Sequence, residues 1–408
     1  MVHVKNNVMR FFALCCAVIC MLSLLPIEAQ GAQTNYKRLA GVTRYSTMSR
    51  ISQEAFPYGS EYVIVASGEN FPDALAASSL AGALQSPIVL TERNKLSTEA
   101  RTEIQRLSAS TAVIIGGTSA VSQSTENEIR GIVSRNRVVR FGGATRYETA
   151  MSIYRNAPST LNVQWGRTAI IATGAKAADA LSISPYAYQS SSPLFLSSES
   201  GLEAGALDVL STTNFDSVVL SGGPSAVPDH VQQQLSSMGL NVKRLGGAHR
   251  YETSRLIGQY TVSTLHLAPQ AVVFATGSDF PDALAGGVLA GVKGSVLLLV
   301  EDGWLDTVSY AVSGIPNPQY LYVLGGPRAV SHATVNAIAS QYGIGSVEQD
   351  LPDRGFVLDP VTPGAFCKKA QEGQKGYSAD GILMVCSYAS YDSAKVPRDD
   401  ARMVAHFG

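Results

Sequence analysis

Three kinds of residue recur in this chain at positions where they could bind a negatively charged group. An Arg-Tyr pair, an Asp-Ala-Leu triplet and a Gly-Gly turn appear in the same order three times. Arg offers a planar guanidinium that suits phosphate or carboxylate. A glycine turn that leads into a helix leaves backbone N–H groups free for an anion. The candidate ligand contacts are Arg44, Tyr45, Arg146, Tyr147, Arg250, Tyr251, Gly116, Gly117, Gly222, Gly223, Gly325 and Gly326.

Each recurring group also has a structural explanation. The arginines could pair with acidic side chains across a boundary between copies, and Glu148 and Glu252 are possible partners within a copy. A tight turn alone accounts for the glycines. The aspartates, each just before an Ala-Leu run, are expected to be helix N-caps or otherwise structural. They are Asp73, Asp179 and Asp282.

The spacing of these groups defines the domain organisation. Arg44, Arg146 and Arg250 are 102 and 104 residues apart, so the repeat is the size of a small domain and not of a solenoid unit. We expect repeats at 36–140, 141–243 and 244–344, a Pro- and Gly-rich linker at 345–364, and a small C-terminal module at 365–408.

Within each repeat, short apolar runs alternate with helical patterns. In the first repeat the runs are 63–68, 87–90 and 112–117, and helical patterns at 73–84 and 96–107 separate them. Strand and helix in alternation predict a parallel sheet with helices on both faces, which is an α/β fold. Helices are expected to begin at Ser122, Pro228 and Ser331, after the Gly-Gly turns.

The two ends of the chain point to export. Lys5 and Arg10 precede an apolar stretch from Phe11 to Leu25, as in a signal peptide over residues 1–31. No second apolar segment approaches a membrane-spanning length. Of the five cysteines, Cys367 and Cys386 lie beyond this segment, and one cysteine pair in an exported chain predicts a disulfide in the C-terminal module.

Charge and motifs exclude several functions. Loss of Lys5, Arg10 and Glu28 with the signal changes the net charge from −1 to −2, which gives no reason to expect a nucleic-acid partner. The six histidines show no metal-binding spacing, so neither a metal site nor a cofactor is predicted. No Gly-x-Ser-x-Gly motif is present, and the repeats contain no cysteine that could act as a nucleophile.

The second copy departs from the other two. The Phe71-Pro72 and Phe280-Pro281 pairs are replaced by Ala177-Ala178, and Lys176 stands where the other copies have Asn70 and Asp279. In the third copy, His249 takes the place of Thr43 and Thr145. The three copies are therefore not expected to offer equivalent sites.

The triple array, with its RYET and FPDAL motifs and its Gly-Gly turns leading to Ala-Val-Ser, resembles the type 2 cell-wall-binding repeat of Gram-positive surface proteins. The resemblance covers about 36–344. It implies three α/β domains in a pseudo-threefold arrangement and non-covalent attachment to an anionic wall polymer or peptidoglycan at the cell surface. The alternatives from the sequence are an amidase-like wall hydrolase and a self-assembling surface-layer protein. The oligomeric state is not specified by the sequence.

Overall fold

The computed structural model describes residues 34–345 and 347, together with four strands near the C-terminus. The predicted signal peptide lies outside the described residues, as does most of the predicted linker. Within the described residues, no helix combines the length and the apolar character needed to cross a membrane.

Three four-stranded parallel sheets form the body of residues 34–345. In the first, the order is β3-β2-β4-β5, with bounds β2 (Tyr62–Ser67), β3 (Ile88–Thr91), β4 (Thr111–Ile115) and β5 (Arg137–Phe141). In the second, the order is β7-β6-β8-β9, with β6 (Thr168–Thr173), β7 (Leu194–Ser197), β8 (Ser217–Ser221) and β9 (Val242–Leu245). In the third, the order is β1-β12-β10-β11, with β1 (Asn35–Leu39), β10 (Ala271–Thr276), β11 (Leu297–Val300) and β12 (Tyr320–Leu324).

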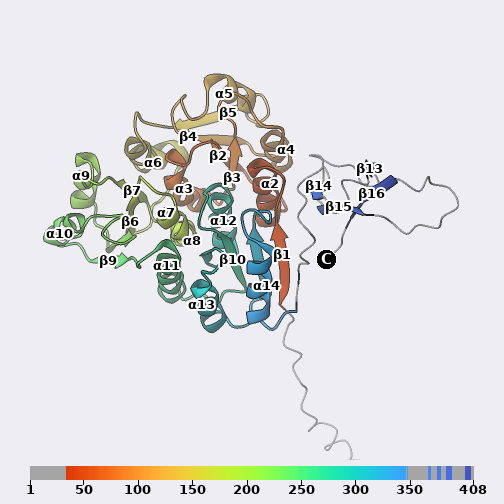
Figure 1. The fold of residues 1–408 in the computed structure, drawn as a ribbon. Coiled ribbons are helices and arrows are strands. Elements are labelled where there is room, and N and C mark those ends of the chain that lie inside the picture. The colour runs from red at the N-terminus through yellow and green to blue at the C-terminus, as the bar shows by residue number, and fades with distance from the viewer. Residues whose placement is uncertain are drawn as a thin grey trace, which may run out of the picture. The chain divides into compact units, whose positions relative to one another are not determined.

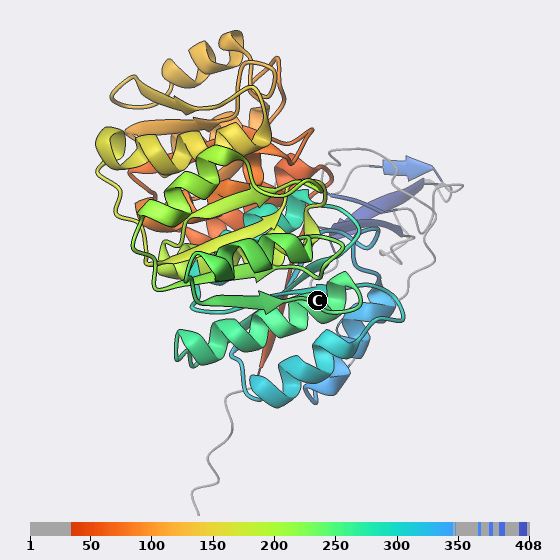
Figure 2. The same cartoon turned by 90° about the vertical axis from the view of Figure 1, so that its left-hand side faces the viewer.

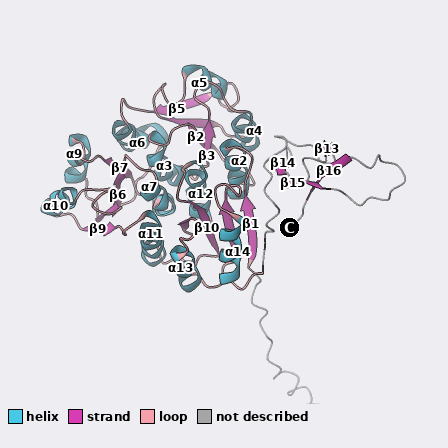
Figure 3. Cartoon of the chain, viewed as in Figure 1, coloured by secondary structure: helices cyan, strands magenta, loops and turns pink. Residues whose placement is uncertain are grey.

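Helices connect the strands and cover the sheets (Figure 3). The first repeat has α2 (Arg44–Ala55), the 3₁₀ helix η1 (Asp73–Ala76), α3 (Ala77–Leu84), α4 (Thr98–Leu107) and α5 (Gln123–Arg130). The second has α6 (Arg146–Leu161), α7 (Ala178–Ser182), α8 (Ser184–Ser190), α9 (Ala204–Thr212) and α10 (Asp229–Ser237). The third has α11 (Arg250–Thr264), α12 (Pro281–Val292), α13 (Asp306–Gly314) and α14 (His332–Gln341).

The predicted fold class is confirmed for the repeats, which are α/β units with parallel sheets. Every residue of β4 is buried, as expected for a strand with helices on both faces. Helices also begin where the sequence predicted, because Ser122, Pro228 and Ser331 are the N-caps of α5, α10 and α14.

The sheet of the third repeat is completed by the first strand of the first repeat. β5 and β9 lie across the predicted repeat boundaries at 140/141 and 243/244, and they pair with β4 and β8 of the repeat before each boundary. β1 opens the first repeat and pairs with β12 of the third, from Asn35 opposite Tyr320 to Leu39 opposite Leu324. The red strand β1 accordingly lies among the teal and blue elements of the third repeat (Figure 1 and Figure 2).

The repeats also meet through their helices. α8 packs against α3 and α12, and α12 packs against α2. Small residues permit this approach, since a side chain at Gly82 would overlap the backbone of Tyr188 and one at Gly287 would overlap Ser184. One hydrophobic core consequently includes residues of all three repeats, among them Val65, Ile170 and Val273.

The C-terminal strands form a separate antiparallel sheet in the order β13-β16-β15-β14. Their bounds are β13 (Phe366–Lys368), β14 (Lys375–Tyr377), β15 (Leu383–Ser387) and β16 (Asp400–Ala405). Cys367 lies on β13 opposite Ala401, and Cys386 lies on β15 opposite Met403.

Candidate functional site

The loops that follow β2, β6 and β10 have the same construction in all three repeats. Each strand ends in a Ser or Thr followed by a glycine, and the hydroxyl accepts a hydrogen bond from a backbone N–H further along the loop. Ser67 accepts from Glu69 at 3.2 Å, Thr173 from Ala175 at 3.1 Å and Thr276 from Ser278 at 3.1 Å. These bonds turn each loop away from its strand.

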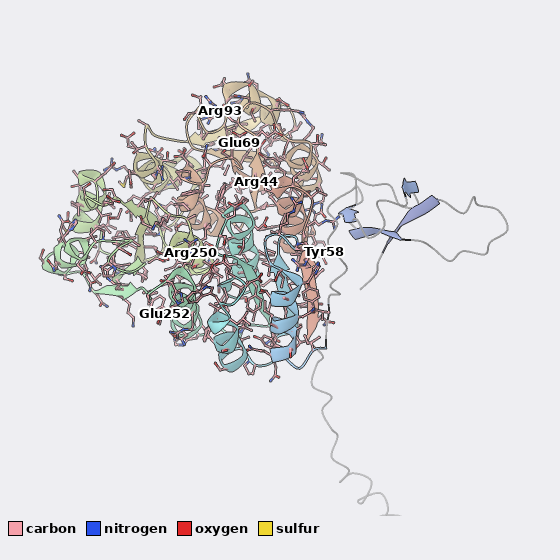
Figure 4. All side chains as sticks on the ribbon, in the orientation of Figure 1. Arg44, Tyr58, Glu69, Arg93, Arg250 and Glu252 are labelled. Atoms are coloured by element: carbon pink, nitrogen blue, oxygen red, sulfur yellow. The ribbon has the colours of Figure 1, made fainter. Side chains whose placement is uncertain are left out.

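The Arg-Tyr pairs hold these loops. Arg44 begins α2 and donates from Nη1 to the carbonyl oxygen of Gly68 at 2.6 Å. Arg146 donates in the same way to Gly174, and Arg250 to Gly277. Arg44 and Arg250 are labelled in Figure 4.

Each tyrosine ring covers the glycine that the arginine binds. A Cβ atom added to Gly174 would lie 2.8 Å from the ring of Tyr147, and one added to Gly68 would lie 2.5 Å from the ring of Tyr45. The third copy repeats the arrangement at Gly277 and Tyr251. The Arg-Tyr pairs therefore have a structural role in fixing these loops. Each guanidinium has other N–H groups in addition to the one on Nη1 that donates to the glycine carbonyl.

An ion pair between repeats forms at one of the three arginines. Arg44 lies 3.8 Å from Asp279 of the third repeat, and its guanidinium carbon is 5.6 Å from the centre of the Phe280 ring. The acidic residues of the RYET motif have a different role from the one proposed on sequence. The N–H of Ala144 donates to Glu148, and that of Ala248 to Glu252, both at 2.7 Å, so these carboxylates close the helix start.

The three aspartates are not N-caps, which corrects that part of the sequence interpretation. The N-caps are Pro72, Ala177 and Phe280, and none of the three makes a side-chain capping bond. Each aspartate lies one or two residues further on, and its carboxyl group faces the first glycine of the Gly-Gly turn. These pairs are Asp73 with Gly116, Asp179 with Gly222 and Asp282 with Gly325.

The first glycine of each turn is required by the backbone. Gly116, Gly222 and Gly325 have φ angles of 98°, 120° and 89°, which other residues rarely adopt. A Cβ at Gly116 would also lie 2.8 Å from Oδ2 of Asp73. The second glycine is less constrained, because the nearest atom to a Cβ at Gly223 is 3.5 Å away.

Two of the aspartates have perturbed acidity. Burial raises the pKa of Asp179 to about 6, against the opposing effects of Arg250 and Lys176. Burial and the neighbouring Asp279 raise the pKa of Asp282 to about 7, against the opposing effect of Arg44. In both cases an arginine opposes the rise in the pKa of an aspartate that belongs to a different repeat. Arg250 of the third repeat acts on Asp179 of the second, and Arg44 of the first repeat acts on Asp282 of the third.

A pocket of about 270 Å³ lies where loops of the three repeats meet. The first repeat contributes Phe71, the second Lys176 and Ala177, and the third Arg250 and Phe280. The rings of Phe71 and Phe280 are 5.5 Å apart and tilted by 57°. Because the second repeat has an alanine where the others have phenylalanine, no third ring fills the space. Two cations and two rings in a pocket of this size can hold an anionic group attached to an apolar body.

The pocket includes only some of the predicted site residues. Arg250 lines it, and Gly277, which Arg250 binds, lines it as well. The pocket is also lined by Lys176, Phe71 and Phe280. From the sequence these positions were known only as differences between the copies and were not predicted as ligand contacts. The Gly-Gly turns are not among its lining residues.

A second set of recurring arginines was missed on sequence. Arg38, Arg140 and Arg244 each stand six residues before an Arg-Tyr arginine. Each donates to the carbonyl of the first glycine in the turn of the preceding sheet, at 2.6, 2.8 and 3.1 Å to Gly325, Gly116 and Gly222. The constant spacing of six residues from the Arg-Tyr arginines was the feature of the sequence that could have revealed them.

Among the described residues, no group of three or more His, Cys, Asp or Glu side chains is arranged to hold a metal ion.

The family model described as Cell wall binding domain 2 (CWB2) matches the chain three times, at residues 38–126, 140–232 and 244–335. Among curated proteins, N-acetylmuramoyl-L-alanine amidase LytC of Bacillus subtilis is 29% identical over 321 residues, covering 78% of this chain and 61% of the relative. The amidase enhancer of the same organism is 28% identical over 309 residues, covering 75% of this chain and 40% of the relative. The chain therefore spans less than two thirds of either relative.

Two solved structures share the fold. Cwp6 from Clostridium difficile superposes with a TM-score of 0.67 at 25% identity, over 83% of this chain and 53% of that one. Cwp8 from the same organism gives a TM-score of 0.65 at 24% identity, over 80% of this chain and 55% of that one.

Proposed function

The chain belongs to the cell wall binding domain 2 family, and from this we propose that it attaches non-covalently to the bacterial cell wall through its three repeats. The observation that carries the proposal is the threefold match of the family model over 38–126, 140–232 and 244–335. We further propose an anionic wall polymer as the ligand, with peptidoglycan as the alternative.

The pocket between the repeats supports an anionic ligand. Lys176 and Arg250 bring two positive charges to the lining of the pocket, and Asp279 contributes its carboxylate. Phosphate or carboxylate groups of a polymer would meet the two cations, while an apolar part would pack on Phe71 and Phe280.

The candidate ligand contacts named from the sequence stay proposals for all three copies. In this proposal Nη1 of each Arg-Tyr arginine serves the loop, and the remaining guanidinium N–H groups serve the ligand. The backbone N–H groups after each Gly-Gly turn would add weaker contacts.

The proposed domain division is 36–140, 141–243 and 244–344, arranged with pseudo-threefold symmetry. Two relations support it. β5 and β9 complete the first and second sheets at the repeat boundaries, and β1 of the first repeat completes the third sheet. Arg250 of the third repeat acts on the pKa of Asp179 in the second, and Arg44 of the first repeat acts on the pKa of Asp282 in the third.

We also propose export to the cell surface through the signal peptide over 1–31.

The disulfide between Cys367 and Cys386 stays a prediction, and the strand order opposes it. β16 lies between β13 and β15, so about 9.5 Å separates the outer two strands, whereas bonded cysteines have Cα atoms within about 7 Å. Thiol titration of unfolded residues 32–408, which contain only these two cysteines, tests it: two free thiols would exclude the bond.

The test of wall binding is co-sedimentation of residues 32–408 with purified sacculi, before and after acid treatment that removes accessory polymers. Binding that is lost on stripping supports an anionic polymer. Binding that persists identifies peptidoglycan as the ligand, and no binding to either preparation contradicts the proposal.

The same sacculi test the hydrolase alternative, because two of the relatives are named as an amidase and an amidase enhancer. A binding protein should leave the turbidity of the suspension unchanged, whereas an amidase would clear it. Sedimentation velocity without wall tests self-assembly, which would appear as oligomers that grow with concentration.

A further inference from the structure

Trp304 is an exposed aromatic residue of the third repeat that has no aromatic counterpart in the other two. It is 42% exposed and lies in the tight turn between β11 and α13. The backbone N–H of Trp304 donates to the backbone carbonyl of Glu301 at 3.0 Å, and Gly303 has the left-handed φ of 80° that the turn needs. Counted from the strand end, the corresponding residues are Lys95 in the first repeat and Gly201 in the second.

Two further rings fix the position of the indole. Tyr251 is stacked beside it at 5.7 Å with an interplanar angle of 21°, and His249 meets it edge-on at 4.3 Å. The hydroxyls of Tyr251 and Ser278 both donate to Glu301, the latter at 2.8 Å. His249 in turn accepts through Nδ1 from the N–H of Glu252 at 3.2 Å. The platform is therefore held rigidly before any ligand arrives.

A polar groove of about 470 Å³ shares His249 with this platform. It runs between α11, which contributes Glu252, Arg255 and Gln259, and α13, which contributes Ser309 and Ser313. The volume falls within the roughly 300–1,000 Å³ of small-ligand sites. Its carboxylate, guanidinium, amide and hydroxyl groups can each bond to a neutral polyhydroxylated molecule. Figure 4 labels Arg250 and Glu252, which both belong to the first turn of α11.

We propose that the His249–Tyr251–Trp304 platform and the adjoining groove bind a sugar ring of the wall glycan. A pyranose has one apolar face of C–H bonds, which packs on the negative face of an indole, and a rim of hydroxyls that the groove can satisfy. This site rests on the proposed function, since the wall supplies the saccharide. It makes the third repeat different from the other two, which lack both Trp304 and His249.

The first test uses sacculi and three variants of residues 32–408. We expect Trp304→Ala to weaken binding about tenfold at both low and high salt, because stacking is not screened by ions. His249→Thr, which restores the N-cap residue of the other copies, should weaken it less. Tyr58→Ala removes a tyrosine that is 100% exposed in the first repeat, so it is the matched control and should bind like the wild type. Wild-type binding by Trp304→Ala would overturn the proposal and leave wall binding intact.

The second test does not depend on wall attachment. Trp165 and Trp304 are the two tryptophans of the chain, so the full-length Trp165→Phe variant reports on Trp304 alone. Soluble glycan fragments released from sacculi by a muramidase should shift its emission saturably, and glycerol phosphate should not. No shift with the fragments would overturn the sugar site even if sedimentation is normal. A shift in a chain that fails to sediment would support the site and contradict the proposed function.

Discussion

Arg38 donates a hydrogen bond of 2.6 Å from Nη1 to the carbonyl oxygen of Gly325, which lies 287 residues further along the chain. Nη2 of the same side chain donates to Val330 at 3.0 Å. These bonds join β1 to the Gly-Gly turn of the third repeat, at the edge where β1 pairs with β12. The third sheet is thus completed by β1, the first described strand. Its stability therefore depends on residues from the opposite end of the three-repeat array.

We predict that Arg38→Met destabilises the array by about 2 kcal/mol, since hydrogen bonds to charged groups are worth roughly 1.5–3 kcal/mol. Urea unfolding would measure the loss, and hydrogen exchange should show it first in β12. Arg135→Met is the control, because the Arg135 side chain is 73% exposed. Equal losses in the two variants would contradict a specific role for Arg38.

The sequence specified the local structure better than the contacts between repeats. The α/β alternation and the helix starts at Ser122 and Ser331 followed from patterns within a few residues. The exchange of β1 did not, because the pattern of a strand gives no information about which sheet it joins. The pocket also could not be predicted, since it depends on Ala177 facing the rings of Phe71 and Phe280 across two boundaries.

Adjacent glycines in one turn should respond differently to alanine. Gly222→Ala should destabilise the protein by about 1–3 kcal/mol, because φ is 120° and the new Cβ would lie 2.7 Å from Oδ2 of Asp179. Gly223→Ala should change the stability by no more than about 0.5 kcal/mol, since its nearest neighbour would be 3.5 Å away. Urea unfolding of both variants makes the comparison, and a larger loss in Gly223→Ala would show that the turn is differently constrained.

Asp282 should make the protein less stable as the pH rises from about 4 to about 7. Its folded-state pKa of about 7 is above the ordinary value of 3.8, so the folded protein holds the proton that the unfolded chain has released. The free energy of unfolding then falls with pH, by at most about 1.4 kcal/mol per pH unit for this group. Below pH 4 the carboxyl is protonated in both states and the effect is absent.

Replacing Asp282 with Asn should remove this contribution. The variant and the wild type should have similar stability near pH 4, and the variant should become the more stable of the two as the pH approaches 7. Urea unfolding across that range measures the difference between the two curves. Parallel curves would mean that the carboxyl titrates alike in the folded and unfolded chains.

Filling the pocket should separate ligand binding from folding. Ala177→Phe supplies the ring that the first and third repeats have, and we expect the pocket of about 270 Å³ to accommodate it. We expect wall binding to fall at least about tenfold while the melting temperature changes little, because the ring would occupy the space next to Arg250.

Lys176→Ala should weaken binding less and flatten its dependence on salt, since it removes one charge from the wall of the pocket. Lys243→Ala, at an exposed position on β9 in the same repeat, controls for net charge. Unchanged binding by Ala177→Phe would move the polymer site away from this pocket, to the Gly-Gly turns or the third-repeat groove.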